Sequence, residues 1–333
     1  MSRSVLSRRS LCGLSCAFLS FALAACSSSG SQTGTSSSAA GSPAASSAAG
    51  SSAAGLPAAT VKNAPVIGGL AKDPAAAALV PASWRAKGTL RVASNATYAP
   101  DEFVAADNSS IVGWDPDLGH ALAKLLGLKF QFVNAQFDEI IPGLAANHYD
   151  LGMSSATVKP DREKVVDFVT DFQAGYAFMV PAGSSVRPAN IAALCGVTVA
   201  VEKGSVEAAA AQQQATACAK GKTLNIQAYP DQNAVSLALS SNRAQVAFAD
   251  SPVIAYQVKL SQGKFAQSGG VFQAGPEGIE IPKGNVGMDK ALQAAMTKLV
   301  SSGTYQKILS NWGVASGAIT QSQIEPPGSG NGS

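Results

Sequence analysis

Apolar and polar positions alternate in short blocks through the first half of the chain's main body. One block, Leu118–Leu126, repeats leucine and alanine at helical spacing and precedes Gly127, a residue typical of helix ends. The order strand, helix, strand, helix, strand predicts a mostly parallel sheet with right-handed crossovers and helices on both faces. The predicted elements are strands at 89–93, 130–133 and 151–153 and helices at 118–126 and 140–145.

The same order of elements begins again near residue 197. Two similar α/β halves without a long linker predict two lobes that face each other. Because ligands of open α/β sheets bind at the carboxyl ends of the strands, we expect a ligand in the cleft between the lobes. The predicted elements are strands at 197–201, 224–226 and 246–248, helices at 205–219 and 234–240, and a further helix after Pro252.

The first 25 residues have the pattern of an export signal. Two arginines precede an apolar run, Leu11–Ala25, which is too short for a stable membrane span. The Leu-Ala-Ala-Cys ending at 23–26 resembles the bacterial lipobox, which implies removal of residues 1–25 and lipidation of Cys26. A signal with an incidental cysteine is the alternative, and both the general and the twin-arginine export routes stay open.

After Cys26 the composition changes to serine, alanine and glycine, which fill 25 of the 29 positions in residues 27–55. Such a segment buries too little apolar surface to offset the entropy of ordering it. We assign residues 26–84 to the lipidated cysteine and a flexible tether, and residues 321–333 to a disordered tail. The body is then expected on the extracytoplasmic face of the cell membrane, anchored through Cys26.

The charge balance excludes one large class of partner. The chain is 46% hydrophobic and 14% charged, and residues 85–333 hold 19 basic and 20 acidic residues. A protein that binds nucleic acid needs a basic surplus to replace phosphate counterions, and this body has none. Outside the first thirty residues no apolar stretch approaches the ~20 residues that cross a bilayer, which excludes a multi-span membrane protein.

The cysteines of the exported body predict a disulfide. Cys195 and Cys218 form an even pair in an oxidising compartment, and two reduced cysteines are the alternative. The chain has no Cys-x-x-Cys motif, and its two histidines, His120 and His148, are expected on a helix face and in a loop. We therefore predict no metal site and no cofactor.

Several short motifs, each weak alone, follow one another in an order that resembles a known family. They lie at 95–103, 112–118, 137–144, 149–153, 157–163, 249–252, 281–284 and 303–308. Across residues 88–319 the chain resembles the amino-acid-binding proteins of ABC importers, in the subgroup for polar amino acids. The resemblance implies the α/β, two-lobed periplasmic-binding-protein (Venus flytrap) fold, each lobe a mainly parallel sheet flanked by helices. Lobe 1 is expected at 85–178 plus 281–320 and lobe 2 at 182–276.

An α-amino acid is a zwitterion, so a dry cleft must neutralise both of its ends. Arg162 is a fixed cation whose planar fork can hold a carboxylate in two parallel hydrogen bonds. The resemblance implies that Arg162 binds the ligand carboxylate and that Ser155 and Thr157 add polar contacts. It also implies that Asp250 takes the ammonium from the opposite lobe. The alternatives are a solvated residue at a helix start for Arg162 and a helix cap before Pro252 for Asp250.

Five further positions are implied to complete the site. Tyr98 and Phe137 stand where the family stacks aromatic rings against the ligand side chain, although lone aromatic residues are more often core. Gly204 and Ser205 open a helix whose backbone N–H groups can bind an anion, with a plain cap at Ser205 as the alternative. Asn95 stands where members that select amide or cationic side chains often have an aspartate.

Departures from the family pattern bear on the choice of ligand. Asp101 replaces an aromatic ring that is common in the family, and Glu202 stands where a lysine or glutamine reaches the ligand. The chain is expected to cross between the lobes near 178–181 and 278–281, and these crossings would form the hinge. Glu277 and Glu280 flank the second crossing. Since acids around a cleft disfavour an acidic ligand, we expect a polar L-amino acid that is neutral or basic.

The predicted function is therefore that of a lipid-anchored, monomeric solute-binding protein, not an enzyme. It captures a polar amino acid between its lobes and delivers it to an ABC permease in the membrane. Two alternatives stay open. One is a cyclohexadienyl-type dehydratase on the same fold, with Glu202 or Glu280 as general acid. The other is a ligand-sensing module for a partner protein.

Overall fold

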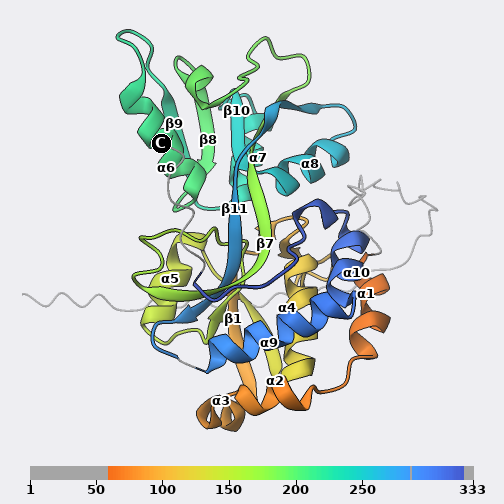
Figure 1. Cartoon of the computed structure of the whole chain (residues 1–333). Coiled ribbons are helices and arrows are strands. Elements are labelled where there is room, and N and C mark those ends of the chain that lie inside the picture. The colour runs from red at the N-terminus through yellow and green to blue at the C-terminus, as the bar shows by residue number, and fades with distance from the viewer. Residues whose placement is uncertain (1–58, 286, 326–333) are drawn as a thin grey trace, which may run out of the picture. The chain divides into compact units, whose positions relative to one another are not determined.

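A computed structural model describes residues 59–285 and 287–325. The predicted signal peptide at 1–25, Cys26, and the tether as far as residue 58 lie outside these residues. The described part contains an eight-stranded sheet and a three-stranded sheet, with helices packed around them in two lobes (Figure 1).

The first lobe is built around three parallel strands. β1 (Thr89–Ser94) lies between β5 (Lys129–Asn134) and β6 (Leu151–Gly152) and runs in the same direction as both. The helices predicted for this half are present as α4 (Trp114–Leu126) and α5 (Phe137–Ala145). The lobe also contains β2 (Thr97–Tyr98), β3 (Glu102–Val104), β4 (Ile111–Val112), α9 (Met288–Ser301) and α10 (Thr304–Trp312).

The second lobe repeats the parallel arrangement. β8 (Thr198–Glu202) lies between β9 (Asn225–Tyr229) and β10 (Val246–Asp250), and all three strands are parallel. Its helices are α6 (Val206–Ala217), α7 (Gln232–Ser240) and α8 (Ser251–Leu260). The predicted fold class, two lobes that each contain a mainly parallel sheet flanked by helices, is confirmed.

Two long antiparallel strands join the lobes. β7 (Val166–Pro181) and β11 (Phe265–Pro282) pair along most of their length, and the sheet order is β5-β1-β6-β11-β7-β10-β8-β9 (Figure 1). β7 is buried at nearly every position. A strand buried on both faces lacks the alternation of apolar and polar residues, so β7 has no alternating pattern from which it could be predicted.

The end of α4 shows how the sequence fixes an element. Gly127 adopts the left-handed conformation, with φ of 70°, and its N–H donates to the carbonyls of Ala123 and Lys124. Glycine adopts this conformation without a Cβ clash, which is why the predicted helix end is confirmed. At the other end Trp114 stacks on Phe172 of β7, with ring centroids 4.5 Å apart, and anchors the helix in the core of the first lobe.

The structure differs from the predicted tether over residues 59–84. Three helices, α1 (Ala59–Gly68), α2 (Pro74–Leu79) and α3 (Ala82–Lys87), pack on the first lobe. A short alanine-rich helix is marginally stable in isolation, although alanine favours the helical conformation. It becomes stable where its apolar face packs against a core.

Specific contacts hold these helices in place. Asp73 caps α2 by accepting from the N–H groups of Ala75 and Ala76 at 3.0 and 2.9 Å. Asn63, which is fully buried, donates to Asp117 of α4 at 2.6 Å. Trp84 of α3 joins the apolar core. An N-terminal helical segment is thus part of the first lobe.

Part of the predicted tail is also ordered on the first lobe. The hydroxyl of Ser322 is buried and donates to the carbonyl of Thr170 at 2.6 Å, and Ile324 bridges Val169 of β7. Residues 326–333 lie outside the described residues.

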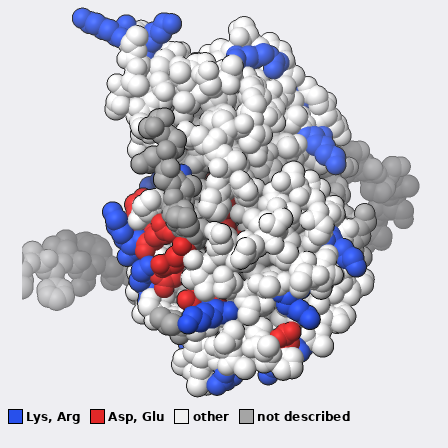
Figure 2. Space-filling view, in the orientation of Figure 1, with Lys and Arg blue, Asp and Glu red and all other residues white. Residues whose placement is uncertain are grey.

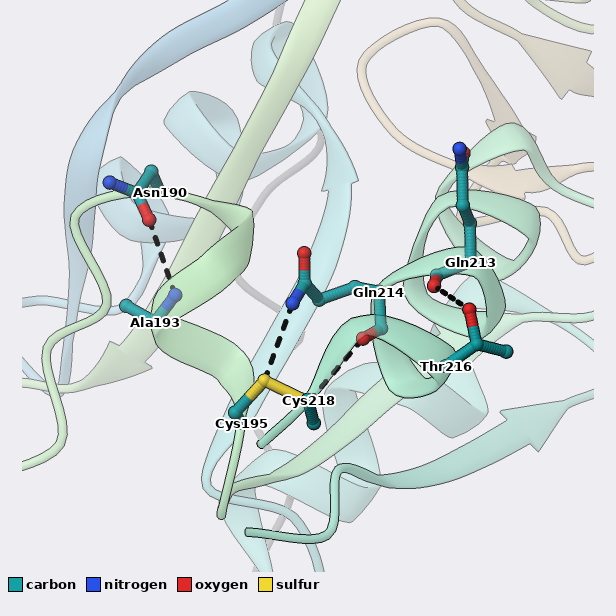
Figure 3. The surroundings of a disulfide bond; sticks show 7 residues. All are labelled: Asn190, Ala193, Cys195, Gln213, Gln214, Thr216 and Cys218. Atoms are coloured by element: carbon teal, nitrogen blue, oxygen red, sulfur yellow. Dashed lines mark hydrogen bonds between the residues drawn. A yellow bond between two sulfur atoms is a disulfide. The ribbon is translucent and has the colours of Figure 1, made fainter. Parts of the chain in front are cut away.

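The predicted disulfide between Cys195 and Cys218 is present (Figure 3). Cys195 follows a short 3₁₀ helix, Ile191–Leu194, and Cys218 ends α6, with their Cα atoms 5.5 Å apart. The side-chain amide of Gln214 donates to Cys195 Sγ at 3.3 Å (Figure 3). The bridge fixes the end of α6 to the segment that leads into β8.

Two further features are the absence of a membrane-spanning helix among the described residues and the distribution of charged side chains on the surface. No helix among the described residues is both long enough and apolar enough to cross a membrane. On the face shown in Figure 2, Lys and Arg side chains are spread widely, whereas Asp and Glu side chains gather mainly in one area.

Candidate functional site

A small cavity lies between the lobes. The first lobe contributes the β2 and β3 region, α5 and the segment 154–162, and the second contributes the ends of β8 and β10 and the start of α6. Eight of the nine predicted ligand-binding residues line it: Asn95, Tyr98, Phe137, Ser155, Thr157, Arg162, Ser205 and Asp250. The ninth, Gly204, lies beside it and contacts Arg162.

Arg162 is held by both lobes. Its Nη1 donates to the carbonyl of Thr157 at 2.9 Å and its Nη2 to the carbonyl of Gly204 at 3.1 Å. The guanidinium also lies over the ring of Phe137, 5.2 Å from the centroid. A guanidinium has five N–H donors, so these contacts orient the group and leave donors for an anion in the cavity.

Asp250 and Tyr98 connect the lobes on another wall. The hydroxyl of Tyr98 donates to Asp250 Oδ2 at 3.0 Å and accepts from the Asp250 N–H at 3.1 Å. Tyr98 also packs into an apolar cluster of the second lobe, so its ring has a core role as well as lining the cavity. Asp250 is the N-terminal cap residue of α8, but its side chain makes no capping bond.

The Ser154–Ser155 pair links the cavity to acids behind it. Ser155 Oγ donates to Asp101 Oδ2 at 3.0 Å, and Ser154 Oγ donates to Glu102 Oε1 at 2.9 Å. The helix cap offered as the alternative for Ser205 is present, because its hydroxyl accepts from the Ala208 N–H at 3.0 Å, and Ser205 also lines the cavity.

Three lining acids were not among the predicted site residues. Glu102, Glu202 and Glu207 join Asp250 in the wall of the cavity, and all four side chains are buried. Asn95 Nδ2 donates to Glu202 Oε1 at 2.8 Å across the cleft. An acid therefore stands beside Asn95 even though Asn95 itself replaces the aspartate of related sequences.

The electrostatics of the cavity are dominated by these acids. Burial raises the pKa of Glu102, Glu202 and Asp250 well above the usual range, and neighbouring carboxylates raise it further. Among the described residues that line the cavity, Arg162 is the single cation. The cavity is thus short of positive charge.

More acids lie behind the cavity, close to β7 and β11. Burial raises the pKa of Asp101 to about 7, of Glu280 to about 7 and of Asp171 to about 8. Glu277 is also buried, and both of its side-chain oxygens lack a hydrogen-bond partner within the part of the chain that the structure describes. Within that part, no group of His, Cys, Asp and Glu is arranged to hold a metal ion.

Contacts beside the cavity show that the lobes are closed on each other. Lys203 of the second lobe forms an ion pair with Asp138 of α5, with Nζ and Oδ2 2.7 Å apart. The N–H of Gln232 donates to the Thr97 hydroxyl at 3.2 Å. Gly204 has φ of +79°, and a Cβ there would lie 2.7 Å from the Cβ of Asp138. Only glycine permits this approach of the lobes.

Comparisons with known proteins agree with this geometry. Residues 90–315 match the family model of the bacterial extracellular solute-binding proteins, family 3. The arginine-binding protein ArgT of Corynebacterium glutamicum is 31% identical over 256 residues, which cover 75% of this chain and 83% of that protein.

Two solved structures of ancestral proteins are also similar. An ancestral arginine-binding protein bound to arginine has a TM-score of 0.64 at 30% identity and covers 68% of this chain and 98% of its own. The ancestral amino-acid-binding protein AncCDT-1, a precursor of cyclohexadienyl dehydratase, has a TM-score of 0.63 at 31% identity, covering 69% of this chain and 97% of its own. With its two lobes and the cavity between them, the chain belongs to family 3 of the bacterial extracellular solute-binding proteins, an extracytoplasmic family that includes amino-acid receptors of ABC importers.

Proposed function

We propose that this protein is a lipid-anchored receptor that captures a basic L-amino acid between its lobes and delivers it to an ABC permease. The observation that carries the proposal is the charge of the cavity, where four buried acids face one arginine. A ligand with one carboxylate and two cationic groups supplies the positive charge that the cavity lacks.

Each part of such a ligand has a partner. The carboxylate fits Arg162, whose guanidinium keeps free donors. The α-ammonium fits Asp250, and the side-chain cation fits Glu102 and Glu202, the second of which accepts a hydrogen bond from Asn95. Relatives named for arginine binding support this choice of ligand.

Closure of the lobes is proposed to occur through β7 and β11. β7 pairs with β11 beside the first lobe up to Thr170, and with β10 of the second lobe from Tyr176 onward. The pairing of β11 is irregular between Ser268 and Gly278. We place the hinge in these segments, a few residues before the two chain crossings expected from sequence near 178–181 and 278–281. Ligand contacts from both lobes then favour the closed state.

The membrane anchor rests on the sequence pattern. Residues 1–25 as a signal, lipidation at Cys26 and a flexible segment before α1 would hold the receptor near its permease. We propose that it acts there as a monomer.

A thermal-shift screen of the twenty L-amino acids tests the proposal. A ligand that binds only the folded protein at one hundred times its Kd stabilises it by about 2.7 kcal/mol. Arginine, lysine or histidine should raise the melting temperature most, and aspartate and glutamate should leave it unchanged. A larger shift with an acidic amino acid, or none with any basic one, contradicts the proposal.

A dehydratase is the second candidate, favoured by the likeness to AncCDT-1 and by buried carboxyl groups that can donate protons. Incubation with prephenate or arogenate decides between the two. Formation of the aromatic product, lost in Glu202→Gln, supports the enzyme, and unchanged substrate supports the receptor.

A further inference from the structure

Glu207, the second residue of α6, lines the cavity from the second lobe. It is 1% exposed, whereas Gln212 and Gln213 farther along the helix are exposed. Its Oε1 has no hydrogen-bond partner among residues 59–285 and 287–325, and the same holds for Oδ1 of Asp250. Both carboxyl groups line the same cavity, and each perturbs the pKa of the other.

Two carboxylates this close in a buried cavity repel each other, and removing both from water as anions is costly. One proton held between them removes the repulsion. It also converts two unpartnered acceptors into a hydrogen bond between a carboxylic acid and a carboxylate, which is a strong pair.

We propose that Glu207 and Asp250 share one proton in the unliganded protein, and that the ammonium of a cationic ligand displaces it, so that ligand capture is linked to proton release. The inference rests on the proposed function, because it requires a cationic ligand at Asp250. Glu207 is then a residue that determines the pH dependence of binding.

The groups around the pair support this assignment. Burial is the largest effect on both groups and raises the pKa of Glu207 and of Asp250. At Glu207 the Ser205 hydroxyl and Arg162 partly offset this effect, whereas at Asp250 the neighbouring acids Glu207 and Asp101 add to it. Other charged or titratable groups act on the pair from several elements. They are Tyr98 of β2, Asp101 just before β3, Lys159 and Arg162 before β7, Tyr176 of β7, Glu202 of β8, and Glu277 of β11.

The direction of the pH effect follows from the displacement. A bound ammonium stabilises both carboxylates and lowers the pKa of the pair, so binding releases a proton wherever the unliganded pair still holds one. Affinity therefore rises with pH, by up to about tenfold per pH unit for one proton.

Isothermal titration calorimetry with L-arginine tests the inference. Titrations of the purified protein between pH 6 and 8, in phosphate and in Tris, give the number of protons exchanged because the two buffers have different ionisation enthalpies. The wild type should release at least one proton per arginine bound, and its affinity should rise with pH. Glu207→Gln should release about one proton fewer than the wild type and show a correspondingly weaker pH dependence.

Glu139→Gln is the matched control, since Glu139 lies exposed on α5 beside the cavity and its variant should release protons as the wild type does. If Glu207→Gln does not fold, Glu207→Ala replaces it. Arginine binding with no proton release, or equal release by the wild type and the Glu207 variant, overturns this inference and leaves the proposed function intact. No arginine binding at any pH overturns both.

Discussion

Arg162 and Gly204 carry much of the contact between the lobes. The guanidinium reaches the Gly204 carbonyl, and the missing side chain of Gly204 lets the second lobe approach Asp138. Family resemblance identified both positions from sequence. Glu207 was not predicted as a site residue, because in the sequence it is an ordinary residue in the first turn of the helix that begins after Ser205. The residues that enclose it in the cavity come from segments distant in the sequence.

Replacing Gly204 with alanine should impede closure. The new Cβ meets Asp138 Cβ at 2.7 Å on a backbone with positive φ, so we expect at least tenfold weaker binding of arginine by calorimetry. Gly221→Ala is the control, because Gly221 has φ of +86° and its new Cβ would meet no neighbouring atom within 4 Å. It should share the backbone strain and keep the affinity; equal loss in both variants would refute the steric account.

Replacing Arg162 with alanine should weaken arginine binding at least a hundredfold. The ligand carboxylate would be buried without its partner, and breaking a buried charge pair costs about 3–5 kcal/mol. Arg187→Ala removes an exposed arginine that also contacts a backbone carbonyl, that of Ala182, and should bind as the wild type does. Unchanged affinity in Arg162→Ala would remove the carboxylate assignment.

At the scale of elements, the sequence predicted those helices and strands whose limits depend on residues close together in the chain. The end of α4 at Gly127 and the succession of strands and helices in both lobes followed from sequence. β7 did not, because it is buried at nearly every position and so lacks an alternating pattern, and β11 did not, because only its second half is mostly buried. α1 to α3 were missed because their stability depends on the buried Asn63 contact and on a core that lies far along the chain.

The disulfide should stabilise the second lobe. Closing a separation of 23 residues is worth about 3 kcal/mol in the chain-entropy model. The double variant Cys195→Ser with Cys218→Ser should lose about that free energy of unfolding in urea, and wild-type protein treated with reductant should match it. A variant as stable as the untreated wild type would show that the bridge adds nothing.

At the scale of the whole molecule, buried acids concentrate along the junction of the lobes. Family resemblance flagged four of them as departures, Asp101, Glu202, Glu277 and Glu280. Their common burial is a property of the closed arrangement, which no local pattern specifies. It gives the unliganded protein an unusual dependence on pH.

The unliganded protein should lose stability as pH rises from 5 to 8. Burial raises the pKa of Asp101 and Glu280 to about 7 and that of Asp171 to about 8, so the folded state binds more protons than the unfolded chain in this range. Each such group contributes up to about 1.4 kcal/mol per pH unit. Thermal unfolding in Glu280→Gln should show a shallower fall. A melting temperature that rises over this range contradicts the prediction.

The central claim is that the acid-lined cavity holds the positive side chain of a basic amino acid. Calorimetry with L-arginine and L-citrulline tests it most directly, because the two have nearly the same shape and citrulline lacks the side-chain charge. We expect arginine to bind at least a hundredfold more tightly, a difference of about 2.7 kcal/mol. Equal affinity for the two ligands, or tighter binding of citrulline, would contradict the account.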